Sequence, residues 1–295
     1  MRVTRVADST YLLDCTEDVA FPLSEVAYIL DGDPPVMIEP GSTATARQLL
    51  VHAAASPVDL RRLAYIIPTH IHVDHGGGAG YLAQHLPDAK ILLHPRGARH
   101  LADPAKLAAA TRGVFGDDFE ERFGPILPVA EARMRVAGDN EVIHLGHRDL
   151  TVMFTPGHAS HHVAIGDSLT GGVFPGEALG YIATAMPDFP LPAAVTPFDL
   201  RLYLESIDRL ATMAPEVLFY SHSGVRSRPQ ALIRGIRENS IALGRVVEQA
   251  MGEGLDPGRI WGRLADYVRR NGGGEIPAEF AMGLSAYMAY FSARS

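Results

Sequence analysis

Four side chains that can bind a metal ion stand within six positions of one another, in the segment THIHVDHGGG. They are three histidines and one aspartate: His70, His72, Asp74 and His75. Neutral imidazoles and carboxylates are the ligands that zinc and related divalent metals take in proteins. One short loop cannot wrap four side chains comfortably around a single ion, but it can place two on one ion and two on a neighbour. The segment therefore predicts a two-metal site.

The sequence on either side of this segment suits such a site. The apolar run at residues 62–68 is predicted to be a buried strand, and it leads directly into the ligands. Three glycines, at positions 76–78, follow where the backbone can turn sharply and begin a helix. A solvated surface loop would rarely combine the histidine spacing with a preceding strand and following glycines. We therefore favour the metal site over the surface loop.

Two metal ions need more ligands than one loop supplies, and three candidates each directly follow a predicted strand. His158 lies in TPGH, Glu177 in FPGE and His222 in YSHSG. Strand ends that face the same edge of a sheet can converge on one point. The alternatives are a buried, hydrogen-bonded histidine at 158 and at 222, and an exposed turn acid at 177. The context of each residue favours the ligand interpretation. His161 and His162 are expected to have structural roles, with a place beside the ligands or against the substrate as the alternative for one of them.

The order HxHxDH, TPGH, a glycine–acid pair and a strand-terminal histidine resembles the metallo-β-lactamase superfamily over roughly residues 1–224. The surrounding sequences are similar to lactonase-like and glyoxalase II-like hydrolases more than to the penicillin-hydrolysing branch. The resemblance implies an α/β fold, an αββα sandwich of two sheets with helices outside and metals at one edge. We predict a catalytic domain over 1–225 and an appended C-terminal helical extension over 226–295.

The resemblance also implies how the ligands divide between the two metals. The first metal would take His70, His72 and His158. The second would take Asp74, His75 and His222. Glu177 would bridge them, at a position where the family usually has aspartate, and its extra methylene leaves the metal spacing open. We expect zinc, with iron and manganese as alternatives. Glu39, in IEPG, stands where the family often has the aspartate of Asp-x-Gly, which is a structural support.

These ligands predict a metal-dependent hydrolase in which a water activated by two divalent metal ions attacks an ester, lactone or thioester carbonyl. Asp74 is expected to act in catalysis by helping the leaving group depart while it is ligated. The sequence contains no G-x-S-x-G nucleophile elbow, which agrees with a water nucleophile. Two alternatives stay open: a glyoxalase II-like thioesterase, whose C-terminal helices bind a thiol carrier, and a di-iron oxygen-binding or redox protein on the same fold.

The composition limits the partners. The 295 residues include 26 Lys and Arg against 34 Asp and Glu, a net charge of −8, which argues against nucleic acid and anionic membrane surfaces. No apolar run reaches the roughly 18 residues of a membrane span, and the single cysteine, Cys15, rules out an intrachain disulfide. We predict a cytoplasmic enzyme with a small-molecule substrate, and leave a homodimer open.

The remaining sequence predicts strands with interspersed helices, followed by an all-helical tail. The predicted strands are 11–14, 26–30, 36–39, 90–94, 141–145, 150–155, 163–166, 172–174 and 216–220. The predicted helices are 42–55, 78–86, 96–107, 199–214, 229–251, 257–270 and 277–293. A long, proline-rich apolar loop at 178–197 is expected between them.

Overall fold

The computed structural model describes residues 2–15, 25–184 and 186–294. The chain forms two compact units, one of Met1–Phe154 with Val163–Phe174 and one of Thr155–His162 with Pro175–Ser295. The second unit contains residues from both sides of the predicted domain boundary after residue 225. Compactness alone does not test that boundary, which stays a prediction.

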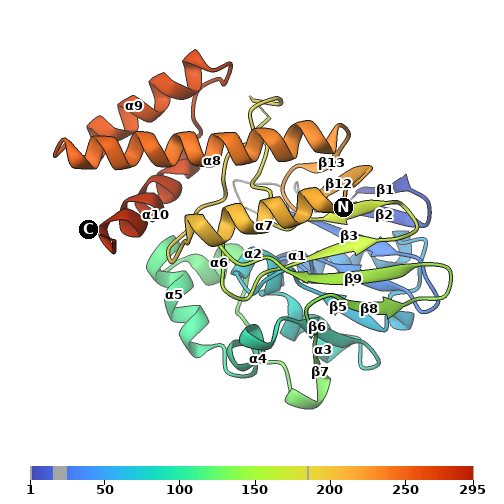
Figure 1. Cartoon of the computed structure of the whole chain (residues 1–295). Coiled ribbons are helices and arrows are strands. Elements are labelled where there is room, and N and C mark those ends of the chain that lie inside the picture. Colours follow the sequence, from blue (N-terminus) through green and yellow to red (C-terminus); the bar gives the residue numbers. More distant parts are fainter. Residues whose placement is uncertain (1, 16–24, 185, 295) are drawn as a thin grey trace. The chain divides into compact units, whose positions relative to one another are not determined.

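The first unit is built around a seven-stranded sheet whose strands follow chain order, β1 to β7 (Figure 1). Its strands are β1 (Arg2–Ala7), β2 (Thr10–Asp14), β3 (Val26–Leu30), β4 (Val36–Ile38), β5 (Tyr65–Ile67), β6 (Lys90–Leu93) and β7 (Met134–Val136). Strands β1 to β4 pair antiparallel, whereas β4 to β7 pair parallel. Because parallel neighbours need crossover connections, helices lie between β4 and β5, β5 and β6, and β6 and β7 in the chain.

The crossover helices form where the sequence supplies caps and apolar positions. They are α1 (Thr43–Val51), α2 (Val73–Gly76), α3 (Ala79–His85), α4 (Pro95–Ala102), α5 (Ala105–Phe115) and α6 (Phe119–Phe123). Helix α1 begins after its N-cap, Ser42, whose side chain accepts a hydrogen bond from the Thr45 backbone N–H. The single helix predicted at 96–107 is instead two helices, because Asp103 and Pro104 interrupt it.

A second sheet in the first unit covers the other face of the seven-stranded sheet. Strands β8 (Glu141–His144), β9 (Asp149–Phe154), β10 (Val163–Asp167) and β11 (Gly172–Phe174) pair antiparallel in this order. The rings of Tyr28 on β3 and Phe174 on β11 meet edge to face, 5.1 Å apart. The two sheets of the predicted sandwich therefore pack against each other.

The central strands are buried on both faces, which explains their uninterrupted apolar sequences. All five residues of β3 and all three of β4 are buried. On one face, Ile29, Met37 and Ile66 pack in a cluster with Leu49 of α1 and Leu82 of α3. This packing fixes the end of β5, from which the ligand segment emerges.

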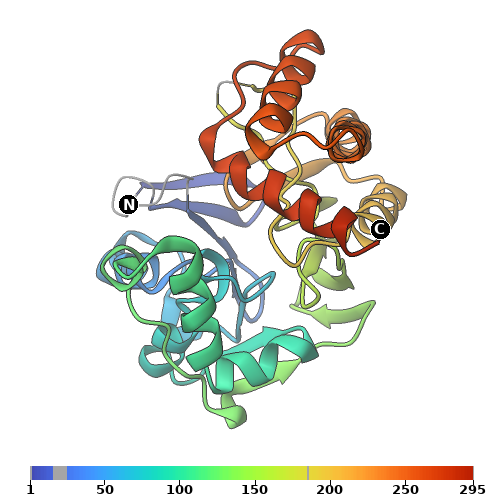
Figure 2. The same ribbon diagram turned by 90° about the vertical axis from the view of Figure 1, so that its left-hand side faces the viewer.

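The second unit contains a short hairpin and four α-helices. The hairpin is β12 (Val217–Tyr220) with β13 (Gly224–Arg226), and the helices are α7 (Leu200–Thr212), α8 (Pro229–Gly252), α9 (Pro257–Arg270) and α10 (Ala281–Ser292). Helix α8 contacts α7, α9 and α10 (Figure 2). The Tyr287 hydroxyl of α10 donates to the Ser240 carbonyl of α8 at 3.0 Å, and both residues are fully buried. The three predicted C-terminal helices are confirmed, the last beginning with a 3₁₀ turn at Ala278–Phe280.

Two short strands lie outside the sequence prediction: β7 and β13. Strand β7 forms one edge of the seven-stranded sheet, and its side chains are exposed or half-buried, so no apolar pattern marks it. No helix in the described ranges is long and apolar enough to cross a membrane.

Candidate metal centre

The ligand segment of the first unit leaves the carboxyl end of β5 and enters α2. His72 is the N-cap of α2, and the helix holds Asp74 and His75. The ring of His70 lies 4.5 Å from that of His72 and 4.1 Å from that of His75, measured between centroids. The Nε2 of His75 lies 3.5 Å from an Asp74 oxygen. The structure therefore brings the four predicted ligands of this segment together.

The turn that gathers these side chains depends on a glycine. A Cβ added to Gly76 would lie 2.8 Å from the Ile71 Cα and 2.9 Å from the His70 carbonyl oxygen, so a side chain cannot fit there without moving the backbone. The glycine lets α2 fold directly back onto the strand end. This close approach explains why glycine follows the last histidine.

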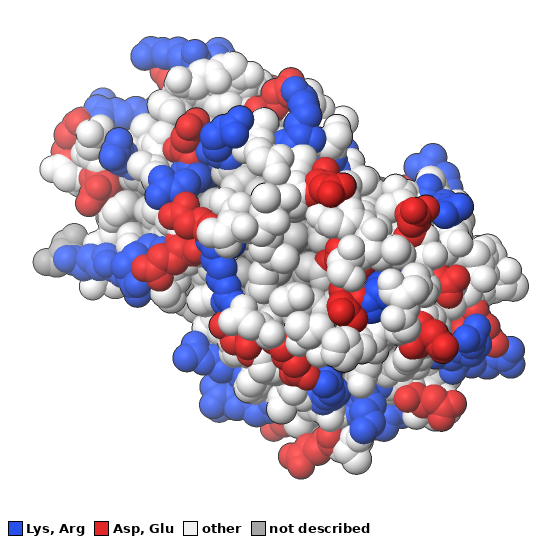
Figure 3. All heavy atoms as spheres, turned by 45° about the vertical axis from the view of Figure 1, so that its right-hand side comes forward, with Lys and Arg blue, Asp and Glu red and all other residues white. Residues whose placement is uncertain are grey.

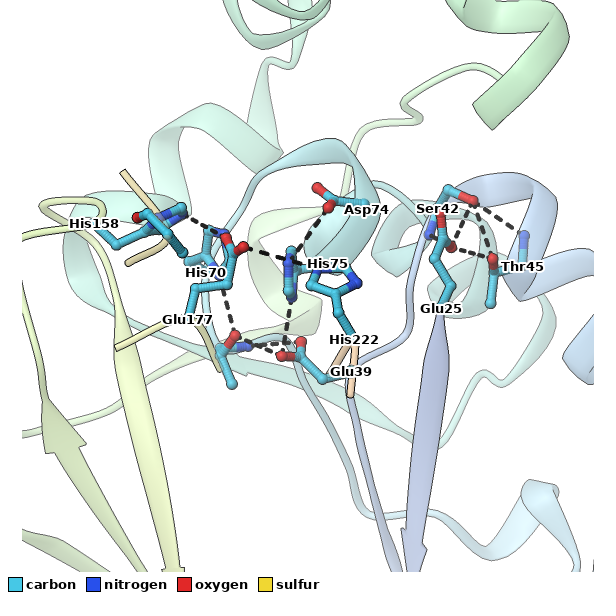
Figure 4. A network of polar contacts seen from close by, with 12 residues as sticks. Glu25, Glu39, Ser42, Thr45, His70, Asp74, His75, His158, Glu177 and His222 are labelled. Carbon is cyan, nitrogen blue, oxygen red and sulfur yellow. Dashed lines mark hydrogen bonds and ion pairs between the residues drawn. The ribbon is translucent and has the colours of Figure 1, made fainter. Parts of the chain in front are cut away.

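One buried carboxylate, Glu39, sets the tautomers of two histidine rings in this unit, one directly and one through Thr69 (Figure 4). Its side chain accepts hydrogen bonds from the Thr69 hydroxyl at 2.7 Å and from the Nδ1–H of His75 at 3.0 Å. Since the Thr69 hydroxyl gives its proton to Glu39, its oxygen accepts from the Nδ1–H of His70, 3.1 Å away. Both rings then keep an unprotonated Nε2, the form that binds a metal ion.

The ligands of the second unit meet around Glu177 (Figure 4). His158 donates its Nδ1–H to the Ala193 carbonyl at 2.7 Å, which leaves its Nε2 unprotonated in the neutral ring. That Nε2 lies 2.8 Å from one Glu177 oxygen, and the Nε2 of His222 lies 3.9 Å from the other. The predicted bridging acid thus presents one carboxylate oxygen to each of two predicted ligands.

The chemistry of these donors fits a cation. The Nε2 of His158 and an oxygen of Glu177 lie 2.8 Å apart, and both offer electron pairs. A proton or a metal ion shared between them stabilises this arrangement. The side chains of His158, Glu177 and His222 are between 0% and 12% exposed, so water cannot easily provide that compensation. Nitrogen and oxygen donors of this kind suit zinc, iron and manganese.

Two buried tyrosines stabilise the backbone around Glu177. Burial raises the pKa of the Tyr203 and Tyr220 phenols, so both stay protonated and act as hydrogen-bond donors. The Tyr203 hydroxyl donates to the Glu177 carbonyl at 3.1 Å, and the Tyr220 hydroxyl donates to the Leu179 carbonyl at 3.4 Å. No sequence motif marks these contacts, because their partners are backbone carbonyls.

Charge on the molecular surface is mixed in sign. On the face drawn in Figure 3, Lys and Arg side chains are interspersed with Asp and Glu side chains. Exposed ion pairs also occur, such as Arg237 with Asp208 and Arg263 with Glu253. The expectation about nucleic acid stays a prediction from the net charge.

The sequence and the structure were compared with those of known proteins. The family model described as the metallo-beta-lactamase superfamily matches residues 20–222. The metallo-beta-lactamase fold-containing protein ST1585 of Sulfurisphaera tokodaii is 27% identical over 213 residues, which cover 71% of this chain and 76% of that protein. A probable metallo-hydrolase of Bacillus subtilis, YqjP, is 24% identical over 70% of each chain.

Solved structures agree with the fold. The metallo-beta-lactamase family protein TTHA1429 from Thermus thermophilus matches with a TM-score of 0.71 and 22% identity. The match covers 98% of this chain and 95% of that one, so it includes the C-terminal helices. The predicted α/β sandwich with an appended helical region is confirmed.

Proposed function

The chain belongs to the metallo-β-lactamase superfamily, and we propose that it is a hydrolase whose seven predicted ligands hold two divalent metal ions. One ion would be held by His70, His72, His158 and Glu177. The other would be held by Asp74, His75 and His222, with Glu177 shared between the two. We further propose that the substrate is a small ester, lactone or thioester and that the resident metal is zinc.

The observation that carries this proposal is the position of the Glu177 carboxylate within the second unit. Its two oxygens face two different histidines, at 2.8 Å from His158 and 3.9 Å from His222. A turn acid outside a metal site would gain nothing from a buried place against the Nε2 of His158, which carries no proton in the neutral ring. A carboxylate that serves two cations does require such a place.

When bound, the two ions supply an activated water and polarise the substrate carbonyl. The residues of the chain prepare the site for that chemistry. Glu39 and Thr69 hold the rings of His70 and His75 with Nε2 unprotonated, and the Ala193 carbonyl does the same for His158. Asp74 is partly exposed, which suits the proposed role of helping the leaving group depart.

The choice of a carbonyl substrate rests on the similarity of the surrounding sequence to lactonase-like and glyoxalase II-like enzymes. The proline-rich loop at 178–197 supplies apolar side chains in the same unit as Glu177, and Tyr181, Met186 and Phe189 in it are buried. An apolar surrounding favours a substrate with an acyl part over a highly charged one. The cytoplasmic location and the homodimer remain proposals from sequence.

The test is metal analysis of protein purified without added metal, followed by a hydrolysis screen on the same sample. We expect about two metal ions per chain and turnover of at least one ester, lactone or thioester. His72→Ala should lose most of the metal and the turnover, whereas His147→Ala, at an exposed histidine, should keep both. Full metal occupancy in His72→Ala, or metal-free wild type that still hydrolyses the substrate, would overturn the proposal. Visible absorbance of the purified protein would indicate a di-iron centre instead of zinc.

A further inference from the structure

A third histidine of the second unit, His162, touches Glu177 without belonging to the predicted ligand set. It is fully buried, and so is Thr155, which directly follows β9. The Nε2 of His162 accepts a hydrogen bond from the Glu177 backbone N–H at 3.1 Å. Its Nδ1 lies 2.7 Å from the Thr155 hydroxyl oxygen. Both ring nitrogens are therefore engaged, and neither remains to bind a metal ion.

These contacts select one state of the ring. A backbone N–H can only donate, so the Nε2 of His162 must be the unprotonated nitrogen. The neutral ring then carries its proton on Nδ1 and donates it to the Thr155 hydroxyl. A doubly protonated ring would direct an N–H at the N–H of Glu177. The geometry thus requires a neutral ring with a single tautomer.

We propose that His162 is a positioning residue that fixes the backbone of Glu177 so that its carboxylate divides between His158 and His222; the inference rests on the proposed function. The Glu177 peptide groups are held on both sides, the N–H by His162 and the carbonyl by the Tyr203 hydroxyl. Glutamate has one more rotatable bond than aspartate and loses more conformational freedom when it is fixed. A fixed backbone reduces the number of arrangements that this longer side chain can sample.

The Thr155–His162 segment is itself fixed by close packing against α7. A Cβ added to Gly157 would lie 2.4 Å from the Tyr203 backbone, and Gly157 has a φ of +135°, which side-chain-bearing residues rarely adopt. The Ser206 hydroxyl donates to the Pro156 carbonyl at 2.6 Å. The same stretch of α7 therefore holds both the loop that carries His158 and the carbonyl of Glu177. His162 completes this arrangement by joining the loop to the Glu177 N–H.

Two substitutions separate this role from ordinary packing. His162→Gln can place its amide oxygen where Nε2 lies and keep the acceptor for the Glu177 N–H. His162→Asn reaches only the position of Nδ1, so it keeps the contact with Thr155 and loses the one with Glu177. Metal affinity is measured by competition with a chelator, and thermal unfolding is measured on the metal-free protein. We expect His162→Asn to bind the weaker of two metal ions about 10–100-fold less tightly, and His162→Gln to stay near wild type.

The outcomes distinguish this inference from the proposed function. If wild type itself holds no metal ion, the proposed function fails. If wild type holds two ions and His162→Asn binds them equally well, only the role of His162 is wrong. Equal losses of metal affinity and of metal-free stability in the Gln and Asn variants would assign His162 to packing. If His162→Asn does not fold, Thr155→Val and Thr155→Ser provide the test. The Ser variant keeps the hydroxyl and should keep the metal affinity, whereas the Val variant should lose it. Equal metal affinities in the two variants would overturn the inference.

Discussion

His75 and Glu39, which are 36 residues apart in the chain, meet in the first unit with Nδ1 of the imidazole 3.0 Å from a carboxylate oxygen. Their side chains are 0% and 4% exposed. Glu39 also has a φ of +61°, an uncommon value for a residue with a Cβ. Its contacts with His75 and with Thr69, at both the hydroxyl and the backbone N–H, stabilise this conformation. The residue that the sequence assigned to structural support therefore orients a predicted ligand directly.

Glu39→Gln should weaken metal binding without removing a ligand. The amide carries no charge. Its single oxygen can still accept from His75 and from the Thr69 hydroxyl, which share one Glu39 oxygen, but its NH2 group then faces the Thr69 backbone N–H that the second carboxylate oxygen accepts. Losses of this kind around a metal site reduce affinity by about 10–100-fold. Chelator competition measures the change, with Glu131→Gln, at an exposed glutamate, as the control. An unchanged affinity in Glu39→Gln would mean that the tautomer of His75 is fixed without the carboxylate.

A buried ion pair at the second sheet of the first unit is linked to the seven-stranded sheet through its arginine, and its loss should destabilise the fold. Arg148 makes two hydrogen bonds to Asp167, at 3.1 and 2.8 Å, and donates to the Ser9 carbonyl at 2.8 Å. Both charged side chains are fully buried. Arg148→Met leaves Asp167 buried without its cationic partner, which costs about 3–5 kcal/mol. Urea unfolding of the metal-free protein measures the free energy.

The matched control is Arg2→Met, which breaks an exposed pair with Asp14 and should cost less than about 1 kcal/mol. Adding Asp167→Leu to Arg148→Met should restore part of the lost stability, because no unpaired charge then remains. A cost for Arg148→Met as small as that of Arg2→Met would show that the pair contributes nothing beyond its packing volume.

The pH dependence of stability should carry the signature of a buried acid, Glu25. Burial raises the pKa of its carboxyl; hydrogen bonds from Thr45 and Ser42 lower it, and the nearby charge of Asp74 raises it further. The folded state therefore keeps this proton at pH values where the unfolded state has lost it. The contribution of Glu25 to the free energy of unfolding is fully present below pH 4.5, the ordinary pKa of a glutamate. It falls as the pH rises from there toward the pKa of Glu25 in the folded state.

Glu25→Gln stays neutral at every pH and lacks this loss. The free energy of unfolding of Glu25→Gln minus that of wild type should thus increase as the pH rises above about 4.5. The measurement uses metal-free protein with a chelator present, because a cation on Asp74 would change the field at Glu25. Glu131→Gln again provides the exposed control. A difference that is constant with pH would show that Glu25 titrates alike in the folded and unfolded chains.

The candidate ligands were recognisable in the sequence because each stands shortly after a strand, and because His70, His72, Asp74 and His75 share one short motif. The hydrogen bonds that orient them were not. The Ala193 carbonyl is 35 residues from His158, and the acceptor of the Glu177 N–H is a histidine 15 residues earlier. Such contacts depend on tertiary packing, which leaves no periodic pattern in the chain. The edge strand β7 escaped prediction for the related reason that its exposed side chains need not be apolar.

The sharpest test of the site is substitution of Glu177, which stands where the family usually has aspartate. Glu177 holds its two oxygens toward His158 and His222, so its removal should cost the more weakly held metal first. Glu177→Gln keeps the size but gives up the charge that compensates two dications. It should retain about one metal ion per chain and lose most of its kcat, since one ion cannot both activate water and stabilise the leaving group as well.

Glu177→Asp restores the residue that the family usually has at this position. Its carboxylate keeps the charge and should retain two metal ions and measurable turnover, with a changed preference among zinc, iron and manganese because the shorter side chain alters the reach to His158 and His222. Glu238→Gln, at an exposed glutamate of α8 in the same unit, controls for a general effect of losing one negative charge. Metal content and kcat are measured for the four proteins side by side. If the Gln and Asp variants of Glu177 bind as much metal as wild type and turn over alike, Glu177 is a turn acid and the metals are held without it.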